Sequence, residues 1–483
     1  MMGAEPAEAC PGDDRLSEAY GKFVRIELEL DAHDVEVGGV HAWSALRPAV
    51  FQKVLLPLGQ ADLWQKPEGG VAVPRWKRLG NMVIRNPLLR RGSASYLVLK
   101  WQRRQRIGDI DDDAISHSLT GVLGPDVLEV FPRGLEYSPG QRALNLDGAE
   151  LTARLLRRFE RCELSASEEK RLAEIERRLH TELCVDLPLR TWFPNYAMTF
   201  RSRRKVMEWI LRKWRIRHVF IVVAHGYPHF IDAAHRLGVP VTDLQHGHIS
   251  WLHVAYDFPP GMRPHYCPDS VLLFSDYWAG AARYAPGTGL FTFGAPHIRA
   301  QLRESATPVR HSGDAQVLFI SQQVINEALL DFAIAFARLP GAPKVLFRLH
   351  PADDIADNRR RVAESGLGDT QFELSYGGGG ATTLNLQRCV QCQAGVYSTA
   401  VVEGVAAGAK SFIIPLPGWT YMKEMVDQGY VRVAATPEAL LKFLEDDGKG
   451  ARPSPDAGPI DRFFAPLRPQ AVEEALRHGR RRH

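Results

Sequence analysis

Three short motifs place side chains that can bind phosphate or move protons directly after predicted strands. The first is Arg348-Leu349-His350-Pro351, in which Pro351 cannot continue a strand and biases His350 away from helical geometry. We therefore expect the imidazole at the carboxyl end of a strand, where it can donate a hydrogen bond to a phosphate or protonate a leaving phosphate. A strand-ending turn with a solvated histidine explains the same motif equally well.

The second motif is Tyr397-Ser398-Thr399, which follows a predicted strand over 393–397 and precedes a predicted helix over 400–407. Ser398 or Thr399 would cap that helix. The free N–H groups and the dipole of a helix start attract anions, and the two hydroxyls add hydrogen-bond donors. An ordinary N-cap without a ligand is the alternative.

The third motif is Gln245-His246-Gly247, which follows a predicted strand over 239–244. A companion, His225-Gly226, follows the predicted strand over 219–224. Two neighbouring strands that each end in His-Gly are not expected from a packed core alone. We therefore predict that His246 is functional and that Gln245, His225 and Gly247 lie with it at the acceptor site or cleft, where Gly247 permits a tight turn.

An acidic cluster offers a second set of catalytic groups. Soon after a predicted strand over 95–100 come four aspartates, Asp109, Asp111, Asp112 and Asp113. In a loop, clustered carboxylates would raise one another's pKa, so that one of them can take the proton of an acceptor hydroxyl. A solvated acidic loop that caps a helix at Ala114 is the alternative. Either this cluster or His246 supplies the predicted catalytic base.

A parallel sheet would bring such motifs to one edge, and the chain has the alternation that builds one. Short apolar strands alternate with helices from 219 to 293, and the alternation starts afresh from 316 to 445. We predict an α/β fold with two doubly wound, Rossmann-like domains facing across a cleft, which bind ligands beyond the carboxyl ends of their strands. The predicted boundaries are 1–303 for the first domain, 304–314 for a linker, 315–460 for the second domain and 461–483 for a basic tail or helix.

The pattern before residue 218 is less regular. The alternation over 23–30 (FVRIELEL) predicts a half-buried strand. The charged stretch over 150–180 has helical spacing and predicts one or two surface helices. One face of these helices carries Leu151, Leu155, Leu156 and Phe159.

Bulk composition excludes several classes of protein. The 483 residues include 60 Lys and Arg against 56 Asp and Glu, a net charge of +4, and 45% are apolar. These values exclude a disordered chain, a collagen-like repeat, a disulfide-stapled module and a polytopic membrane protein. No apolar run is long enough to span a membrane and the first residues lack a signal-peptide pattern, so we expect a cytoplasmic protein. Cys389 and Cys392 lack the further ligands that zinc needs, and no metal site is predicted.

The positive charge is concentrated in one segment. Between Arg201 and Arg217 the chain has eight Lys and Arg against one acid, Glu208, and these are interleaved with Trp209, Ile210 and Trp214. This pattern predicts peripheral contact with a membrane surface or an anionic glycan, and no nucleic acid is expected as a partner. A basic helix packed by its apolar face is the alternative.

The combination of motifs resembles a known group of enzymes. A strand followed by Arg-Leu-His-Pro, and then a strand followed by Tyr-Ser-Thr, resembles the His-Pro and Ser-Ser or Ser-Thr motifs of bacterial sialyltransferases, Kdo transferases and capsule polysaccharide enzymes. The Gln-His-Gly segment is similar to one in bacterial surface-polysaccharide glycosyltransferases. The resemblance covers residues 218–435 approximately. It implies a GT-B-like fold and a CMP-linked sugar donor, of the sialic acid or Kdo type.

The resemblance also implies residue roles. His350 would contact the donor phosphate or nucleotide, the Ser398-Thr399 pair would bind phosphate, and Glu403 would accept hydrogen bonds from ribose hydroxyls. As an alternative, Glu403 is an acid favoured near a helix start. The implied donor-binding set is Ser321, Gln322, Arg348, His350, Pro351, Ser398, Thr399 and Glu403.

This sequence departs from the group in one respect. It has no clear copy of the acidic motif that supplies the base in the inverting members, so the base and the stereochemical outcome stay open. The implied architecture needs neither a metal nor a tightly bound cofactor, although magnesium stays open.

We therefore predict a glycosyltransferase that moves a sugar from a nucleotide donor to a surface glycan or glycolipid, as in capsule or lipopolysaccharide synthesis, at the inner face of the membrane. The alternatives are a polyol-phosphate transferase of the teichoic-acid type, a nucleotide-sugar epimerase, and a noncatalytic nucleotide-binding component of a polysaccharide assembly complex.

Overall fold

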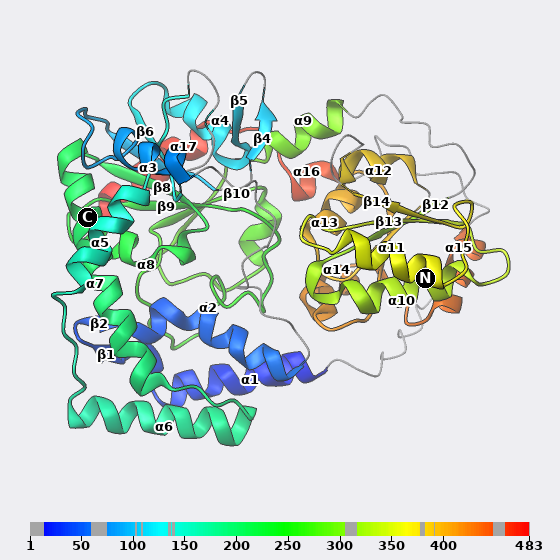
Figure 1. The fold of residues 1–483 in the computed structure, drawn as a ribbon, viewed down its shortest axis with the longest axis horizontal. Coiled ribbons are helices and arrows are strands. Elements are labelled where there is room, and N and C mark those ends of the chain that lie inside the picture. Colours follow the sequence, from blue (N-terminus) through cyan, green and yellow to red (C-terminus); the bar gives the residue numbers. More distant parts are fainter. Residues whose placement is uncertain are drawn as a thin grey trace, which may run out of the picture. The chain divides into compact units, whose positions relative to one another are not determined.

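The chain forms two compact units (Figure 1). The computed structural model describes residues 14–58, 75–101, 104–107, 110–133, 137, 141–304, 316–376, 382–390, 392–447 and 459–482. The first unit is built from Lys22–Phe51, Gly70–Arg299 and Asp461–His483, and the second from Ala300–Ile460 with Met1–Gly21 and Gln52–Gly69. Each unit has its own parallel sheet.

The sheet of the first unit has seven strands in the order β11-β10-β9-β8-β3-β6-β7, and every pairing in it is parallel. Its strands are β3 (Tyr96–Leu99), β6 (Val127–Phe131), β7 (Leu144–Asn145), β8 (His218–Val222), β9 (Val241–Leu244), β10 (Ser270–Leu273) and β11 (Gly289–Thr292). The chain starts at β3, builds outward to β7, and then returns to β8 on the other side. The topological switch point, where ligands bind in doubly wound sheets, therefore lies between β3 and β8.

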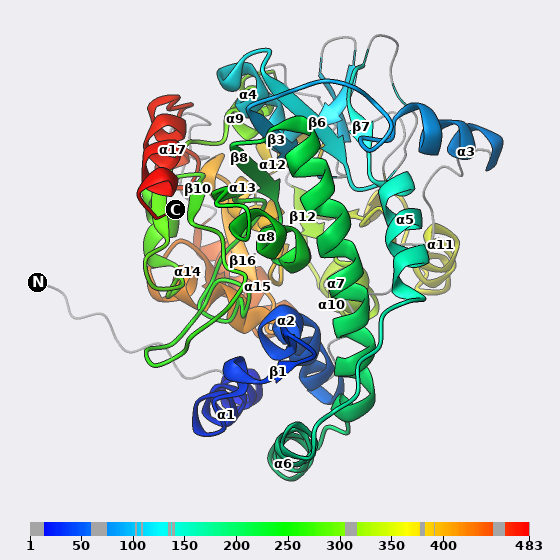
Figure 2. The same cartoon turned by 90° about the vertical axis from the view of Figure 1, so that its left-hand side faces the viewer.

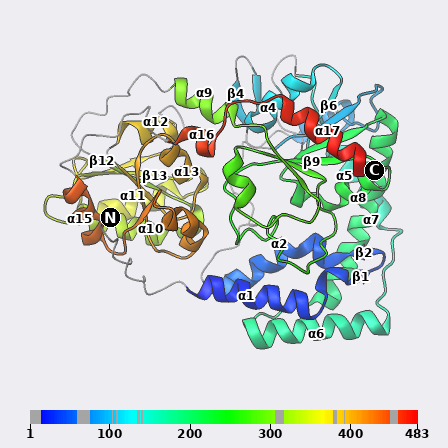
Figure 3. The ribbon, with the colours of Figure 1, turned by 180° about the vertical axis from the view of Figure 1, so that it is seen from behind.

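Helices cover both faces of this sheet, because alternate strand residues point to opposite sides. On one face Leu97 and Ile221 pack in a core with α7 (Leu189–Trp214) and α8 (Pro228–His235). On the other face Val98 and Phe220 pack in a core with α4 (Ala114–Leu123) and α17 (Gln470–Arg482). Figure 3 shows α17, in red, beside the strands that it covers.

The sheet of the second unit has six parallel strands in the order β14-β13-β12-β15-β16-β17. Its strands are β12 (Gln316–Ile320), β13 (Lys344–Arg348), β14 (Phe372–Ser375), β15 (Cys392–Gly395), β16 (Lys410–Ile413) and β17 (Arg432–Val433). Its helices are α10 (Asn326–Ala337), α11 (Ile355–Glu364), α12 (Thr383–Cys389), α13 (Thr399–Ala406), α14 (Lys423–Asp427) and α15 (Pro437–Asp447). The switch point of this sheet lies between β12 and β15.

The predicted fold class is confirmed, since both sheets are parallel and doubly wound in the Rossmann-like manner. The chain also forms α1 (Asp14–Glu29), α2 (Ala42–Leu55), α3 (Arg75–Ile84), α5 (Asp147–Arg157), α6 (Ala166–Leu183), α9 (Pro296–Glu304) and α16 (Ile460–Phe463). Two antiparallel hairpins are β1 (Glu36–Val37) with β2 (Val40–His41), and β4 (Arg104–Ile107) with β5 (Ile110–Asp113). Of the predicted linker 304–314, Glu304 ends α9 and the rest lies outside the described residues.

The strand predicted over 23–30 is wrong, because residues 23–29 belong to α1 and Leu30 forms the turn after it. Phe23, Ile26 and Glu27 are buried, which is the spacing of one helical face, whereas Leu28 is 37% exposed. An apolar partner in α2 selects the helix, since Phe23 packs on Trp43 and Phe51. The short alternating run fitted a strand and a helix equally well, and the tertiary contact decided between them.

A buried ionic network joins these two helices. Glu27 accepts hydrogen bonds from Arg47 Nε at 2.7 Å and from Trp43 Nε1 at 2.7 Å. Burial alone would raise the pKa of Glu27, but the charge of Arg47 and the hydrogen bond from His33 lower it to about 2. Arg47 Nη1 also donates to the Asp257 carbonyl at 2.7 Å, so the network ties α1 and α2 to a loop of the first unit.

Of the one or two surface helices predicted over 150–180, two are present, α5 and α6, but their predicted apolar face is not buried throughout. Leu151, Leu155 and Phe159 are 47%, 48% and 86% exposed. The buried side of α5 consists instead of small residues, among them Ala149 and Ala153, which allow close packing against α7.

Residues 201–214 of the basic segment lie in α7, and 215–217 follow it. The apolar face of α7 is a central part of the first core. Ile210 and Trp214 are buried and only Trp209, of the three interleaved residues, is exposed. Several of the basic side chains pair with acids, such as Arg201 with Glu160. Among the described helices none is both long and apolar enough to cross a membrane.

Candidate functional site

In the first unit, aromatic and titratable side chains gather where β3, β8 and β9 end, at and beside the switch point. Trp101 follows β3, His225 follows β8 and His246 follows β9. The ring of His246 lies 6.2 Å from that of Trp101 and 5.7 Å from that of His225, measured between ring centroids. The structure thus brings together two histidines that the sequence predicted to lie near each other.

Three residues that the sequence did not single out, Tyr256, Asp243 and His253, complete this cluster. Tyr256 Oη donates a hydrogen bond to Asp243 Oδ2 at 2.7 Å and lies 3.5 Å from His246 Nδ1. Asp243 Oδ1 in turn accepts a hydrogen bond from the Ala224 amide at 2.9 Å. His253 lies against both Tyr256 and His225, with ring centroids 4.8 and 5.6 Å away. We call His225, His246, His253, Tyr256 and Asp243 the histidine cluster.

Burial sets the charge state of the histidine cluster. It raises the pKa of Asp243 to about 7 and lowers the pKa of His253 to about 4. Burial, with the neighbouring histidines, also holds the pKa of His225 well below its usual value. The Nδ1 atom of His225 is buried without a hydrogen-bond partner, so His225 has an unused polar atom inside the cluster.

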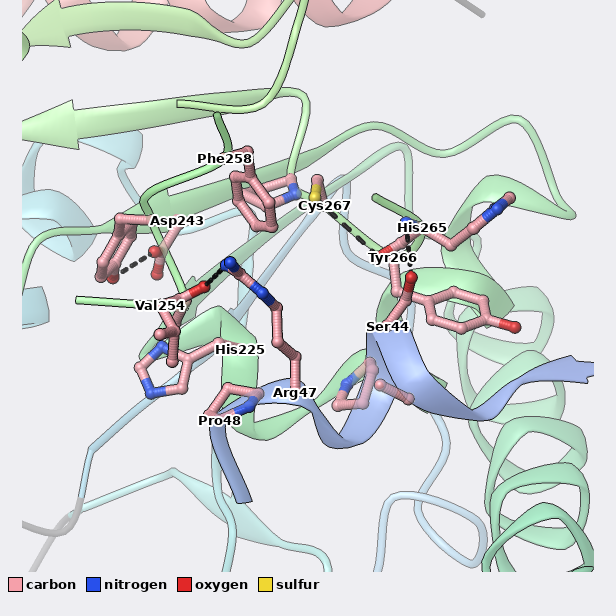
Figure 4. A pocket seen from close by; sticks show the side chains of 15 residues that line it. Ser44, Arg47, Pro48, His225, Asp243, Val254, Phe258, His265, Tyr266 and Cys267 are labelled. Atoms are coloured by element: carbon pink, nitrogen blue, oxygen red, sulfur yellow. Dashed lines mark hydrogen bonds between the residues drawn. The ribbon is translucent and has the colours of Figure 1, made fainter. Parts of the chain in front are cut away.

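The hydrogen bonds suggest which nitrogen of His246 is basic. When Asp243 is ionised, Tyr256 gives its single hydroxyl proton to that carboxylate, so its oxygen can only accept from the Nδ1–H of His246. In that tautomer Nε2 is the basic nitrogen. A cavity of about 40 Å³ adjoins the cluster and is lined by His225 and Asp243 together with Arg47 (Figure 4).

Gln245 and Gly247 shape the loop that carries His246. Gln245 is 1% exposed; its Nε2 donates to the Gly247 carbonyl at 2.9 Å and its Oε1 accepts from the Phe274 amide at 2.8 Å. These bonds hold the loop between β9 and β10. Gln245 therefore positions the loop that carries His246.

The acidic cluster does not form the predicted loop. Asp111, Asp112 and Asp113 lie in β5, and Asp109 lies outside the described residues. Asp113 caps α4 through the amides of Ile115 and Ser116, as the alternative predicted, but it is buried and not solvated.

Asp112 is held by two basic partners. Lys100 Nζ donates to its Oδ1 at 2.6 Å and His117 Nδ1 lies 2.9 Å from its Oδ2. Burial alone would raise the pKa of Asp112, but Lys100 lowers it below the usual value. Burial raises the pKa of Asp113 instead. The carboxylates differ through their own surroundings, not by raising one another's pKa as the sequence analysis assumed.

In the second unit, hydrogen bonds tie the ends of β12 and β13 together. Ser321 Oγ donates to Asp353 Oδ2 at 2.7 Å, and the His350 amide donates to the same oxygen at 2.7 Å. Asp353 Oδ1 is buried without a hydrogen-bond partner. The Ala352 amide donates to His350 Nδ1 at 3.2 Å, so the neutral ring of His350 carries its proton on Nε2 and can donate from there.

The ends of β12 and β15 are also linked, across the switch point. Gln322 Oε1 accepts a hydrogen bond from the Tyr397 amide at 3.1 Å. Ser398 is the N-cap of α13, since its Oγ accepts from the Ala400 amide at 3.2 Å, and Thr399 is the first helical residue. Four predicted donor-binding residues, Ser321, Gln322, His350 and Ser398, therefore lie on the strand ends around one switch point.

The remaining predicted donor-binding residues lie around this edge in different ways. Arg348 Nη1 donates to Ser375 Oγ at 2.9 Å, which links β13 with β14, and burial lowers its pKa. Pro351 is an exposed turn residue beside His350. Glu403 lies half-buried, one turn into α13. Within the residues that the structure describes, no group of three or more His, Cys, Asp or Glu could hold a metal ion.

The chain has distant structural neighbours but no matching family model. No protein-family model matches the chain, and no curated protein matches it. The chain is similar to UDP-GlcNAc 2-epimerase from Methanocaldococcus jannaschii, with a TM-score of 0.46, 10% identity, and coverage of 79% of this chain and 99% of that one. It is also similar to MurG from Acinetobacter baumannii (TM-score 0.42, 10% identity, 80% and 95% covered) and to the glycosyltransferase SnogD from Streptomyces nogalater (0.34, 12%, 81% and 95%).

One fold hosts many unrelated functions, so activity depends on the side chains at the sites. Four residues at these sites, Tyr256, His253, Asp243 and Asp353, were not predicted from the sequence. Two signals could have found the aspartates. Asp243 is an acid inside the apolar strand over 239–244, and Asp353 comes two residues after His350-Pro351.

Proposed function

We propose that the protein is a glycosyltransferase that uses a nucleotide-sugar donor. The observation that carries this proposal is that both doubly wound sheets gather polar groups at their switch points, with donors for anions in one and a histidine cluster in the other. Switch points are where doubly wound sheets bind nucleotides and their substrates.

The second unit would bind the donor. His350 offers an N–H donor at the end of β13, and the Ser398 hydroxyl and the first turn of α13 offer further donors beside Gln322. Together these groups can stabilise the negative charge of a phosphate, and of the phosphate that leaves when the sugar is transferred. Glu403 would accept hydrogen bonds from the ribose. We propose a CMP-linked sugar, on the resemblance of the His-Pro and Ser-Thr motifs.

The first unit would activate the acceptor. His246 Nε2 would take the proton from the acceptor hydroxyl while that oxygen forms the new bond to the sugar and the sugar–phosphate bond breaks. Tyr256, held by Asp243, would accept from Nδ1–H and stabilise the resulting imidazolium. Asp112 is the alternative base. The acceptor would be a surface glycan or glycolipid at the inner face of the membrane.

His350→Ala should lower kcat/KM for the donor by at least about tenfold, because a hydrogen bond to a charged phosphate contributes about 1.5–3 kcal/mol. His350→Gln keeps a side-chain N–H donor but cannot protonate a leaving group, so a recovered KM with a low kcat would separate binding from proton donation. Wild-type kinetics for His350→Ala would contradict the role of this histidine.

Replacing Ser398 and Thr399 together by alanine should raise the donor KM.

A titration of the purified protein with CMP, CDP, UDP and GDP, followed by thermal shift and calorimetry, tests the proposal. We expect binding of CMP and a raised melting temperature. Binding of UDP but not CMP would contradict the CMP donor and leave the nucleotide-sugar class in place. No response to any of the four nucleotides would contradict the proposed function.

A further inference from the structure

Three segments of the first unit expose only basic and large apolar side chains. In the segment 79–91, around the end of α3, the exposed residues are Leu79, Val83, Ile84, Leu89, Arg90 and Arg91. In the segment 142–161, around α5, they are Arg142, Leu151, Arg154, Leu155, Arg158, Phe159 and Arg161. In the segment 205–217 of α7 and its end, they are Lys205, Trp209, Arg212, Lys213, Arg215 and Arg217. We call these three sets the apolar-basic surface.

The acids of these segments are withdrawn from the surface. The side chains of Glu150, Glu160 and Glu208 are 24%, 11% and 16% exposed, and each is paired with an arginine of α7, for example Glu150 with Arg203 at 2.9 Å. Glu160 also pairs with Lys205, and the fourth acid, Asp147, is only partly exposed. The exposed arginines in and beside α5 therefore face solvent without an exposed acid among them. Charged surfaces of globular proteins usually intersperse both signs, so this one-sided composition is unusual.

Packing contacts bring the three segments together. Along α7, α5 packs through the Arg203–Glu150 pair and through Arg157 Nε, which donates to Thr199 Oγ1 at 2.9 Å. At the other end of α5, Gly148 packs closely against α3. A Cβ atom at this position would lie only 2.6 Å from the carbonyl oxygen of Met82.

The end of α7 contacts the segment after α3, since Trp214 Nε1 donates to the Pro87 carbonyl at 2.8 Å. Figure 2 shows α5 alongside α7, with α3 beyond its end.

We propose that the apolar-basic surface is the face by which this protein binds a bilayer that contains anionic lipids. Side chains such as Phe159, 86% exposed, and Leu89, 61% exposed, would enter the boundary between headgroups and acyl chains. The surrounding arginines and lysines would contact the anionic headgroups. The charge favours a bilayer over a second copy of the chain, because a twofold contact through this surface would place like charges opposite one another.

The proposal changes the residues that the sequence analysis assigned to membrane contact. The sequence predicted contact through the basic segment with Trp209, Ile210 and Trp214, but Ile210 and Trp214 are buried. The apolar side chains come from α3 and α5 instead, and α7 contributes mainly charge. The binding of lipid does not depend on the proposed transferase activity, so the two can fail separately.

Co-sedimentation with vesicles tests the proposal. The full chain should bind phosphatidylcholine vesicles that contain phosphatidylglycerol, bind pure phosphatidylcholine much more weakly, and lose most binding at high salt. Changing Leu151, Leu155 and Phe159 together to aspartate should reduce the fraction bound at least about tenfold. Changing Arg154 and Arg158 to glutamate should also reduce the fraction bound at least about tenfold, but only with vesicles that contain phosphatidylglycerol.

The matched control is Leu28→Asp, since Leu28 is an exposed leucine of α1, outside the apolar-basic surface. It should bind vesicles like the wild type, and circular dichroism should show native folding of all variants. Failure of the wild type to bind either vesicle, or equal loss in the control and the α5 variant, would overturn the proposal. So would a dimer in solution that the α5 variant dissociates. Nucleotide affinity should stay at the wild-type value in every variant.

Discussion

A His246→Ala variant should lose at least about a hundredfold in kcat while its donor KM changes little, because a positioned general base contributes typically 10²–10⁴-fold. The reason lies in the placement of this ring, which ends β9 beside Trp101 and His225 and is joined through Tyr256 to Asp243. Steady-state kinetics with the donor identified by titration would measure the change. His180→Ala, at an exposed histidine of α6, is the matched control and should be neutral.

Tyr256→Phe separates a positioning role from a structural one. It removes the oxygen that accepts from His246 Nδ1–H, which should lower kcat, and it removes the hydroxyl that donates to Asp243. Because that donated hydrogen bond lowers the pKa of Asp243, the acid limb of the kcat profile should move to higher pH. Because burial raises the pKa of Asp243 to about 7, we expect the wild type to lose activity as the pH falls through neutrality, when Asp243 takes up a proton. An unshifted profile in Tyr256→Phe would contradict the role of this hydrogen bond.

Arg47→Ala should destabilise the first unit by about 3–5 kcal/mol, since it leaves Glu27 buried without its charge partner. Urea unfolding followed by intrinsic fluorescence would measure the loss of unfolding free energy. Arg25→Ala is the matched control, because Arg25 pairs with Glu182 at the surface with 53% of its side chain exposed. A loss for Arg47→Ala no larger than that of the control would contradict the importance of the buried network.

The pH dependence of the same network has a definite sign. The pKa of Glu27 is lowered to about 2 in the folded protein, from 4.5 for an ordinary glutamate. Its stabilising contribution is therefore fully present above pH 4.5 and is lost as the pH falls from there towards 2. The control Arg25→Ala should share this acid loss with the wild type.

The parallel sheets could be predicted from the sequence because buried strands such as those over 219–224 and 316–320 are short, apolar and regularly separated by helices. The sequence also indicated which residues end these strands, and His350, Ser398 and His246 all lie at strand ends in the structure. Strand-end residues are local features, so the spacing of apolar runs and the following Gly or Pro were sufficient to find them.

Other parts depend on contacts between distant residues. The helix α1 forms because Phe23 packs on Trp43 and Phe51, which the run FVRIELEL alone does not indicate. Asp243 accepts a hydrogen bond from Tyr256, which lies in the long loop that follows β9. Asp112 accepts one from Lys100, which directly follows β3. The small residues on one side of α5 allow it to pack on α7 and turn Leu155 and Phe159 outward, against the expected burial of the larger side chains.

Hydrogen–deuterium exchange with and without the nucleotide that binds most tightly would locate the donor site. We expect slower exchange of backbone amides at 321–326, 350–353 and 397–401, the strand ends of the second unit that Ser321, His350 and Ser398 occupy. Ser398→Ala with Thr399→Ala should weaken this protection at a fixed nucleotide concentration. Protection confined to other parts of the chain, with these three segments unchanged, would contradict the claim that this switch point holds the donor.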